Sequence, residues 1–125
     1  MTDLTRKAVA EFVGTMNRIP AVLTPRGATL LGRVVDVHDR GARATGDRVT
    51  ALVRPEGLTV TKAPAGAGIV SGKTFLGSVT RLLVLLSDTV SVHVDFSSVA
   101  AASIGVGDPV DVNLIAPSVL VTDAT

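Results

Sequence analysis

The stretch GDRVTALVRPEG, residues 46–57, decides the fold because a turn, a strand and a proline break follow one another within it. Its Gly-Asp pair is typical of a turn. From Val49 to Val53 apolar and polar side chains alternate, less cleanly at Leu52, which places one row of side chains in a core and the other toward water. Pro55 ends this strand, because proline has no backbone N–H to donate to a sheet.

The same order recurs near the C-terminus, which indicates an internal repeat. GDPV at residues 107–110 matches GDRV at residues 46–49, and APSVLVT at residues 116–122 resembles RPEGLTVT at residues 54–61. The second copy carries about one extra residue. Self-similarity of this kind is typical of repeated structural units. We therefore expect two related halves within one barrel.

Short alternating segments recur through the rest of the chain. Residues 90–96 and 110–114 alternate with a period of two, as half-buried strands do. The run LLVLL at residues 82–86 does not alternate in polarity, so we expect it to be covered on both faces. Residues 98–103 are predicted to form a short helical turn. Many short strands separated by frequent turns predict an all-β fold, a small barrel or sandwich.

The N-terminal segment has a different period from the rest of the chain. Apolar side chains recur at helical spacing through residues 3–13, and a glycine follows where a helix would end. After Pro20 the period changes to two. We expect a helical linker segment at residues 1–19 and a single β-barrel domain at residues 20–125.

The composition limits the classes of function. The chain has 125 residues, no cysteine and a net charge of +1, and only 2% of its residues are aromatic. It therefore lacks the basic groove and stacking aromatics of a nucleic-acid-binding barrel. The longest strongly apolar run, residues 82–86, is far shorter than the ~20 residues of a membrane span. We expect a soluble, non-secreted domain with no nucleic-acid partner and no direct membrane insertion.

One segment, AGAGIVSGKT at residues 65–74, nearly matches a phosphate-binding loop. Ala67 replaces the first glycine of that pattern, and residues 75–80 have the pattern of a strand and turn instead of the helix that such a loop requires. A turn followed by a strand, with Lys73 solvated on that strand, is the better interpretation. A weak anion contact at Lys73 and Thr74 is the alternative.

No set of residues indicates catalysis or metal binding. His38 and His93 lie apart on the polar phases of expected strands, and no cysteine accompanies them. The aspartates at positions 36, 39 and 47 cluster around a loop without a neighbouring base or nucleophile. We expect no enzymatic activity, no catalytic residue, no cofactor and no metal site.

Several segments, taken in order, resemble one known family. VAEFVGTMNRIP at residues 9–20 is similar to the segment just after the ATPase core in importer-type ABC transporter ATP-binding subunits. Residues 46–58 resemble the core of the TOBE (transport-associated OB) domain that follows in those subunits. FLGS at residues 75–78 and VGDPV at residues 106–110 resemble later parts of the same domain. The resemblance runs from about residue 5 to the C-terminus.

The resemblance implies an OB-like small barrel that serves as a non-catalytic C-terminal domain of an ABC importer of the iron or polyamine type. Such domains help two ATPase subunits pair and receive regulatory signals. The implied partners are a second copy in a homodimer, the ATPase core and the membrane permease subunits. The implied location is the cytoplasm, peripheral to the inner face of the membrane. The Walker A, signature and Walker B motifs are absent from this sequence, so we expect no ATP hydrolysis.

Arg54 and Glu56 flank Pro55 in the TOBE-like motif. The structural interpretation is the end of a strand with local surface charges. The functional interpretation is a contact with a partner subunit or with the ATPase core. The structural interpretation is favoured because the second repeat has Ala116 and Ser118 at the equivalent positions.

A second hypothesis for function is a small-ligand sensor for an oxyanion or for the transported substrate. A related branch of the family binds molybdate or tungstate through a Ser-Ala-Arg-Asn segment and a lysine near the last strand. This chain lacks the first segment and has Ala-Pro-Ser at residues 116–118 where the lysine would lie. The candidate anion ligands are therefore weak ones: Ser71, Lys73 and Ser118.

Overall fold

The computed structural model of the chain describes residues 16–124. The helix predicted over residues 3–13, and most of the predicted linker at residues 1–19, lie outside the described residues. The described part is mainly β-structure, with ten strands, one 3-10 turn and one short helix. No helix within residues 16–124 is long and apolar enough to cross a membrane.

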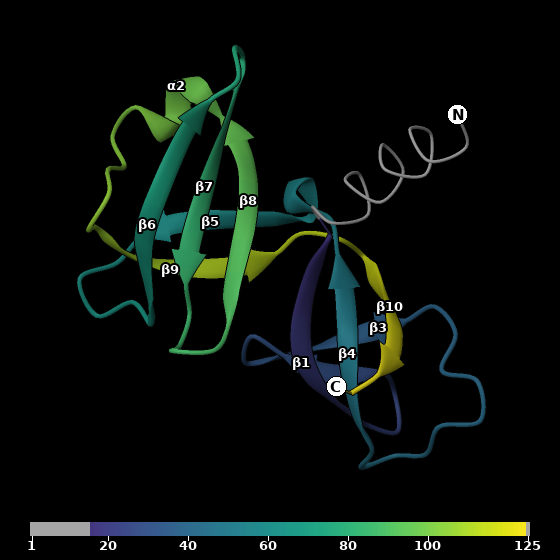
Figure 1. Cartoon of the computed structure of the whole chain (residues 1–125). Coiled ribbons are helices and arrows are strands. Elements are labelled where there is room, and N and C mark those ends of the chain that lie inside the picture. The colour runs from purple at the N-terminus through teal and green to yellow at the C-terminus, as the bar shows by residue number, and fades with distance from the viewer. Residues whose placement is uncertain (1–15, 125) are drawn as a thin grey trace, which may run out of the picture.

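Five strands form a closed barrel, which we call the first unit (Figure 1). They are β1 (Asn17–Leu23), β2 (Ala28–Leu30), β3 (Arg33–Val37), β4 (Arg48–Val53) and β10 (Ser118–Asp123). β1 lies between β2 and β4, and β2 pairs with β3. β10 closes the barrel by pairing parallel with β3 and antiparallel with β4.

A second five-stranded sheet, which we call the second unit, curves beside the first (Figure 1). Its strands are β5 (Leu58–Lys62), β6 (Gly68–Phe75), β7 (Val79–Leu85), β8 (Ser91–Ser97) and β9 (Pro109–Leu114). The strand order is β5-β9-β6-β7-β8, and each neighbouring pair is antiparallel. The short helix α2 (Ser98–Ala101) follows β8, where the sequence predicted a helical turn.

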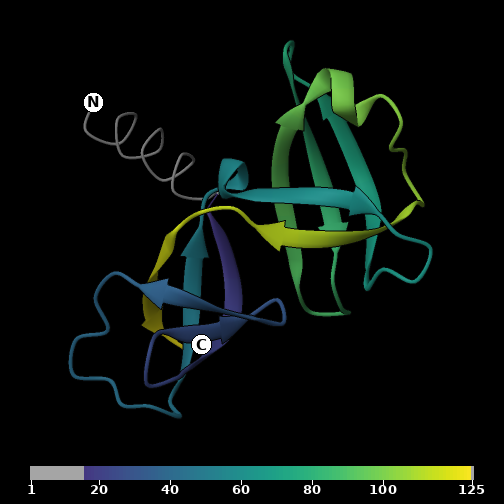
Figure 2. The ribbon, with the colours of Figure 1, turned by 180° about the vertical axis from the view of Figure 1, so that it is seen from behind.

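Each copy of the sequence repeat supplies one strand to each unit. In the first copy, the 3-10 turn η1 (Pro55–Gly57) carries the chain from β4 to β5, and in the second copy residues 115–117 carry it from β9 to β10. The backbone N–H groups of Ile115 and Ala116 both donate to the carbonyl of Gly57, at 2.8 and 3.3 Å. The two connections are therefore tied together, and Figure 2 shows them leaving the first unit at the same corner.

This arrangement corrects the expectation of one barrel built from two related halves. Read around the first unit, the order β10-β4-β1-β2-β3 matches the order β5-β9-β6-β7-β8 of the second. Each half of the chain therefore builds one unit and gives one strand to the other unit. Pro55 and Pro117 lie in the two connections, where a residue without an N–H helps to end one sheet before the next begins. The all-β barrel class is confirmed, with one closed barrel and a second five-stranded sheet among the described residues.

The Gly-Asp pair of each repeat forms the same turn. Both glycines have positive φ values, 95° and 96°, which glycine adopts without strain. The carboxylate of Asp47 accepts a hydrogen bond from the N–H of Ala44, and that of Asp108 accepts one from Gly105, each at 2.9 Å. The repeated sequence thus encodes a repeated turn that leads into β4 and β9.

Alternating apolar side chains fill the interior of both units. Burial alternates residue by residue through β1. In the second unit the interior is formed by fully buried leucine and valine side chains from β6, β7, β8 and β9: Val70, Leu82, Val84, Val92, Val94 and Val110. Removal of such apolar surface from water is the main stabilising contribution to a fold of this kind.

The run at residues 82–86 was expected to be covered on both faces, and this prediction is wrong. Leu82 and Val84 are 0% exposed, whereas Leu85 is 44% exposed. The outer positions of β7 carry leucine where most strands of this chain carry polar residues. Buried and more exposed side chains therefore alternate along β7, but this alternation cannot be seen in the polarity of its sequence.

Candidate functional site

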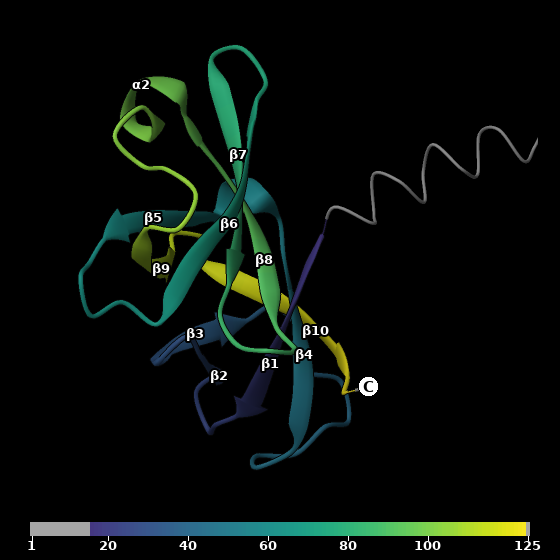
Figure 3. The same cartoon turned by 60° about the vertical axis from the view of Figure 1, so that its left-hand side comes forward.

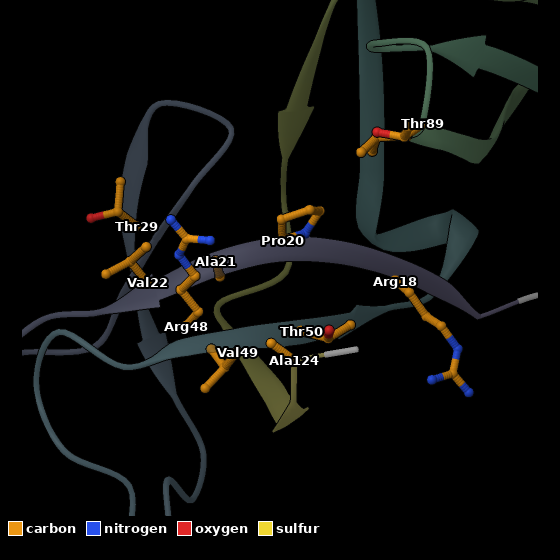
Figure 4. A pocket seen from close by; sticks show the side chains of 11 residues that line it. Arg18, Pro20, Ala21, Val22, Thr29, Arg48, Val49, Thr50, Thr89 and Ala124 are labelled. Atoms are coloured by element: carbon orange, nitrogen blue, oxygen red, sulfur yellow. The ribbon is translucent and has the colours of Figure 1, made fainter.

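The β7–β8 turn of the second unit lies beside the first unit (Figure 3). A groove with a volume of about 650 Å³ is lined by residues of both (Figure 4). Its residues come from β1, β2, β4, the β7–β8 turn and the end of the chain after β10. They are Arg18, Pro20, Ala21, Val22, Thr29, Arg48, Val49, Thr50, Thr89, Val90 and Ala124. Volumes of about 300–1,000 Å³ are typical of small-molecule sites.

The floor of the groove follows from the period of two in β1 and β4. The outward positions of β1 carry Arg18, Pro20 and Val22, while its inward positions are buried. In the antiparallel register, Pro20 lies opposite Thr50 and Val22 lies opposite Arg48. Side chains directly opposite each other in such a pair share one face, so β1 and β4 present a single outward strip.

The opposite wall is the β7–β8 turn, which carries Thr89 and Val90. The hydroxyl oxygen of Ser87 accepts hydrogen bonds from the N–H groups of Thr89 and Val90, at 3.3 and 3.1 Å. The N–H of Leu86 also donates to the carbonyl of Val90 at 2.8 Å. These bonds give the wall a defined shape, although the turn is exposed.

Asn17 fixes the second unit against the first, close to the groove. Its side-chain amide donates to the carbonyl of His93 in β8 and accepts from the N–H of the same residue, both at 2.7 Å. Asn17 is only 4% exposed. The side-chain amide thus pairs with the backbone of β8 as a neighbouring strand would. Asn17 directly precedes the groove residue Arg18.

Arg18 and Arg48 supply the positive charge of the groove. Neither guanidinium has a hydrogen bond or an ion pair with any residue between 16 and 124. Arg43, by contrast, contacts Asp123 at 2.9 Å. An unpaired guanidinium offers up to five N–H donors, so both groove arginines are available to a ligand.

Arg81 of the second unit is an example of an arginine that pairs with a carboxylate. Two of its nitrogens donate to the carboxylate of Asp95, at 2.7 and 2.9 Å. This side-chain hydrogen bonding, aided by the charges of Asp95 and Glu56, raises the pKa of Arg81 above its ordinary value. The pair lies partly buried across β7 and β8, and it serves to join those strands.

The lining of the groove combines cationic, hydroxyl and apolar side chains. Its polar side chains are two arginines and three threonines, and the rest of the lining is apolar. No carboxylate, histidine or other general base is among the lining residues, so the groove holds no nucleophile paired with a base. Within residues 16–124, no group of three or more metal-ligating side chains gathers at one place.

Two of the three predicted anion ligands, Ser71 and Lys73, lie on β6 of the second unit. The ammonium of Lys73 donates to the carbonyls of Ala101 and Ile104, at 2.8 and 2.7 Å, and so holds the end of α2. The hydroxyl of Ser71 is 3.4 Å from the carbonyl of Leu83. Their role as anion ligands remains a prediction, and both groups already have protein partners.

Ser118, the third predicted anion ligand, belongs to the first unit. It begins β10 and lies opposite Asp36 of β3. The structure therefore does not bring Ser118 together with Ser71 and Lys73. None of the three lines the groove.

The Arg54-Pro55-Glu56 motif lies at the connection between the units. Pro55 is buried at the start of η1, and the N–H of Gly57 donates to the carbonyl of Arg54 at 2.8 Å. Glu56 contributes to the positive shift in the pKa of Arg81. These contacts agree with the structural interpretation of the motif, while a contact with a partner subunit stays a prediction.

Comparison with protein families matches residues 51–121 to the TOBE domain. The chain belongs to the TOBE domain family. The match begins within β4 and ends within β10, so it spans both connections and the whole second unit. The resemblance of the Gly-Asp and Arg-Pro-Glu segments to TOBE domains is confirmed.

Several solved structures share the fold of this TOBE protein. One is described as the cytoplasmic molybdate-binding protein ModG, in a form with molybdate bound. The TM-score is 0.68, and the alignment covers 86% of this chain and 96% of that chain at 13% sequence identity. At this identity the likeness shows the fold alone. A search of curated protein sequences finds no match.

Neither Arg18 nor Arg48 was among the residues that the sequence singled out. Arg18 falls in the segment expected to be a helical linker, and Arg48 falls between the Gly-Asp turn and the strand expected at residues 49–53. A lone arginine at such positions is normally a solvated side chain. Their place on one outward strip becomes visible only with the strand register.

Proposed function

We propose that this TOBE protein is a non-catalytic module that binds a small anionic ligand in the groove between its units. The observation that carries the proposal is that two guanidinium groups, Arg18 and Arg48, which have no hydrogen bond or ion pair with residues 16–124, lie on one groove of ligand size. Three threonine hydroxyls add hydrogen-bonding groups for orientation. A charged group placed beside an apolar lining is typical of small-molecule sites.

The relation to ModG supports a binding role. That protein has the same fold over nearly its whole length, and it is a molybdate-binding protein by description. Small-ligand binding is therefore compatible with this architecture. The ligand of this chain is inferred from the residues of its own groove. These residues differ from the anion ligands predicted from the sequence, Ser71, Lys73 and Ser118.

Binding of anions can be measured by titration of the labelled protein with anion panels, followed in amide NMR spectra. We expect shifts at β1, β4 and the β7–β8 turn, and we expect Arg18→Ala or Arg48→Ala to weaken them. Arg33→Ala is a matched control, because Arg33 is exposed but does not line the groove. Shifts that are equal in all variants would contradict the proposed site.

A second candidate function is an interaction module of an ABC importer, as the TOBE family suggests. The observation that favours it is a group of exposed apolar side chains at the end of the β6–β7 hairpin and on α2. They are Phe75 (73% exposed), Leu76 (54%), Val79 (37%) and Val99 (88%). Exposed apolar groups that lie together are typical of contact surfaces.

For this second candidate we propose a homodimer, with the ATPase core and permease subunits of the importer as further partners on the cytoplasmic side of the membrane. Light scattering at several concentrations measures the dimer directly. The expected result is a dimer that Phe75→Ser weakens. A monomer at every concentration would contradict the homodimer and leave the ligand-binding proposal unaffected.

A further inference from the structure

The two arginines of the groove are too widely spaced to share one compact anion. Arg48 lies on β4 opposite Val22, and Arg18 lies opposite Leu52. Arg48 is therefore level with Val22 of β1, and Arg18 lies four residues before Val22 on the same strand. At ~3.3 Å per residue, the two side chains leave the sheet about 13 Å apart along the strand.

The side chains diverge further from these positions. Figure 4 shows Arg18 and Arg48 on either side of Pro20, with their guanidinium groups directed away from each other. A tetrahedral oxyanion such as molybdate or sulfate spans only a few ångströms. It would therefore contact one guanidinium and leave the other without a counter-charge.

The strip between the arginines suits the middle of a longer molecule. Pro20 lies between the levels of the two arginines, Val22 lies opposite Arg48, and Val90 of the turn is a further apolar residue of the lining. The hydroxyls of Thr50 and Thr89 lie in the same groove. The lining thus changes from cationic to largely apolar and back to cationic along β1.

The nearby carboxylates of Asp47 and Asp88 are not among the side chains that line the groove. Asp47 precedes Arg48, but its carboxylate accepts a hydrogen bond from the N–H of Ala44 in the repeated turn. Asp88 precedes Thr89 in the β7–β8 turn, and it is not among the residues that line the groove. Among residues 16–124, the charged side chains that line the groove are Arg18 and Arg48.

We propose that the groove takes an elongated small molecule with an anionic group at each end, of the class of long linear dicarboxylates. This inference rests on the proposed function, since it specifies the ligand of the same groove. One anionic end pairs with Arg18 and the other with Arg48, while the chain between them covers Pro20 and Val22. Charge-assisted hydrogen bonds at both ends fix the ligand along β1.

The test is an NMR titration of the full chain with linear dicarboxylates from succinate to dodecanedioate. Monocarboxylates of equal length, molybdate and sulfate serve as comparison probes. Affinity should rise with chain length until both arginines are reached. The monocarboxylate of the best length should bind about tenfold more weakly, because one charge-assisted contact is missing.

Variants assign the two ends of the ligand. Arg18→Ala and Arg48→Ala should each weaken the longest effective dicarboxylate about tenfold, and Arg33→Ala should leave it unchanged. In each single variant the dicarboxylate should bind no better than its monocarboxylate. All variants replace exposed side chains, and their spectra without ligand report whether the fold is retained.

The outcomes distinguish failure of the elongated ligand from failure of anion binding in the groove. If molybdate or sulfate binds in the groove as tightly as the long dicarboxylates, the elongated ligand is wrong while anion binding in the groove stands. The same holds if a monocarboxylate equals the dicarboxylate. If no anion shifts the groove resonances, both the elongated ligand and the proposed function are overturned.

Discussion

Asn17 connects the two units at the residue scale, because its amide satisfies both backbone polar groups of His93. The site is buried, so the groups could not turn to water if the amide were removed. A buried donor or acceptor without a partner costs about 1–3 kcal/mol. This single side chain therefore contributes to both the stability of the chain and the position of the groove wall.

Replacement of this amide tests its contribution. Asn17→Ala should lower the free energy of unfolding by about 1–3 kcal/mol, because the N–H and the carbonyl of His93 both lose a partner. Urea unfolding followed by circular dichroism measures the change. Asn113→Ala is the matched control, since Asn113 is a half-buried asparagine of β9. Equal losses in the two variants would show that the amide does not join the units.

A second residue-scale prediction concerns pH. The hydrogen bond from the N–H of Gly105 lowers the pKa of Asp108 below its ordinary value, and the charges of Lys62 and Lys73 lower it further. A carboxylate with a lowered pKa stabilises the folded state above the pKa of the unfolded chain, and this stabilisation is lost as the pH falls through the folded-state pKa.

Thermal unfolding between pH 7 and pH 2 should show this dependence. The melting temperature of the natural chain should fall as the pH drops below about 4, where unfolded aspartates begin to take up protons. Asp108→Asn should make the decrease shallower, because the amide oxygen can still accept from Gly105 but does not titrate. Identical pH profiles for the two proteins would show that Asp108 is not responsible.

At the element scale, the alternation of side chains predicts several strands correctly. The segments expected at residues 90–96 and 110–114 correspond to β8 (Ser91–Ser97) and β9 (Pro109–Leu114). β7 is the exception, since Leu83 and Leu85 occupy outward positions that polar residues would normally mark. Hydrophobic pattern alone cannot separate a strand covered on both faces from one that exposes leucine.

Replacement of Leu82 and of Leu85 in β7 should change the free energy of unfolding by very different amounts. Leu82→Ala should lower the free energy of unfolding by about 2–5 kcal/mol, because a fully buried leucine leaves a cavity. Leu85→Ala removes a side chain that is 44% exposed, and the loss should be below about 1 kcal/mol. Chemical unfolding measures both. Similar losses at the two positions would instead support coverage of both faces of β7.

At the scale of the whole molecule, strand exchange unites the two units. β10 completes the first unit although it follows β9 of the second. The repeat predicted related halves, but it could not show that each half gives a strand to the other. The choice of partner depends on contacts between distant segments, such as Ser118 opposite Asp36. The groove was unpredictable for the same reason, because its lining comes from strands and a turn far apart in sequence.

The exchanged strand should matter for the whole chain. Val119→Asp places a carboxylate at a position that is 3% exposed inside the first unit. We expect a loss of about 3 kcal/mol or more, since a buried charge lacks a partner there. Leu120→Asp, at a neighbouring position that is 49% exposed, should change little. If both variants unfold at the same denaturant concentration, β10 does not close the first unit.

The central claim, that the groove binds an anion through two arginines, is tested most directly with the Arg18→Ala, Arg48→Ala double variant. The measurement is the dissociation constant of the tightest-binding anion for the natural chain and the double variant, at low and at high salt. We predict saturable binding to the natural chain that salt weakens by screening, and no measurable binding to the double variant. Equal dissociation constants for the two proteins would contradict the account.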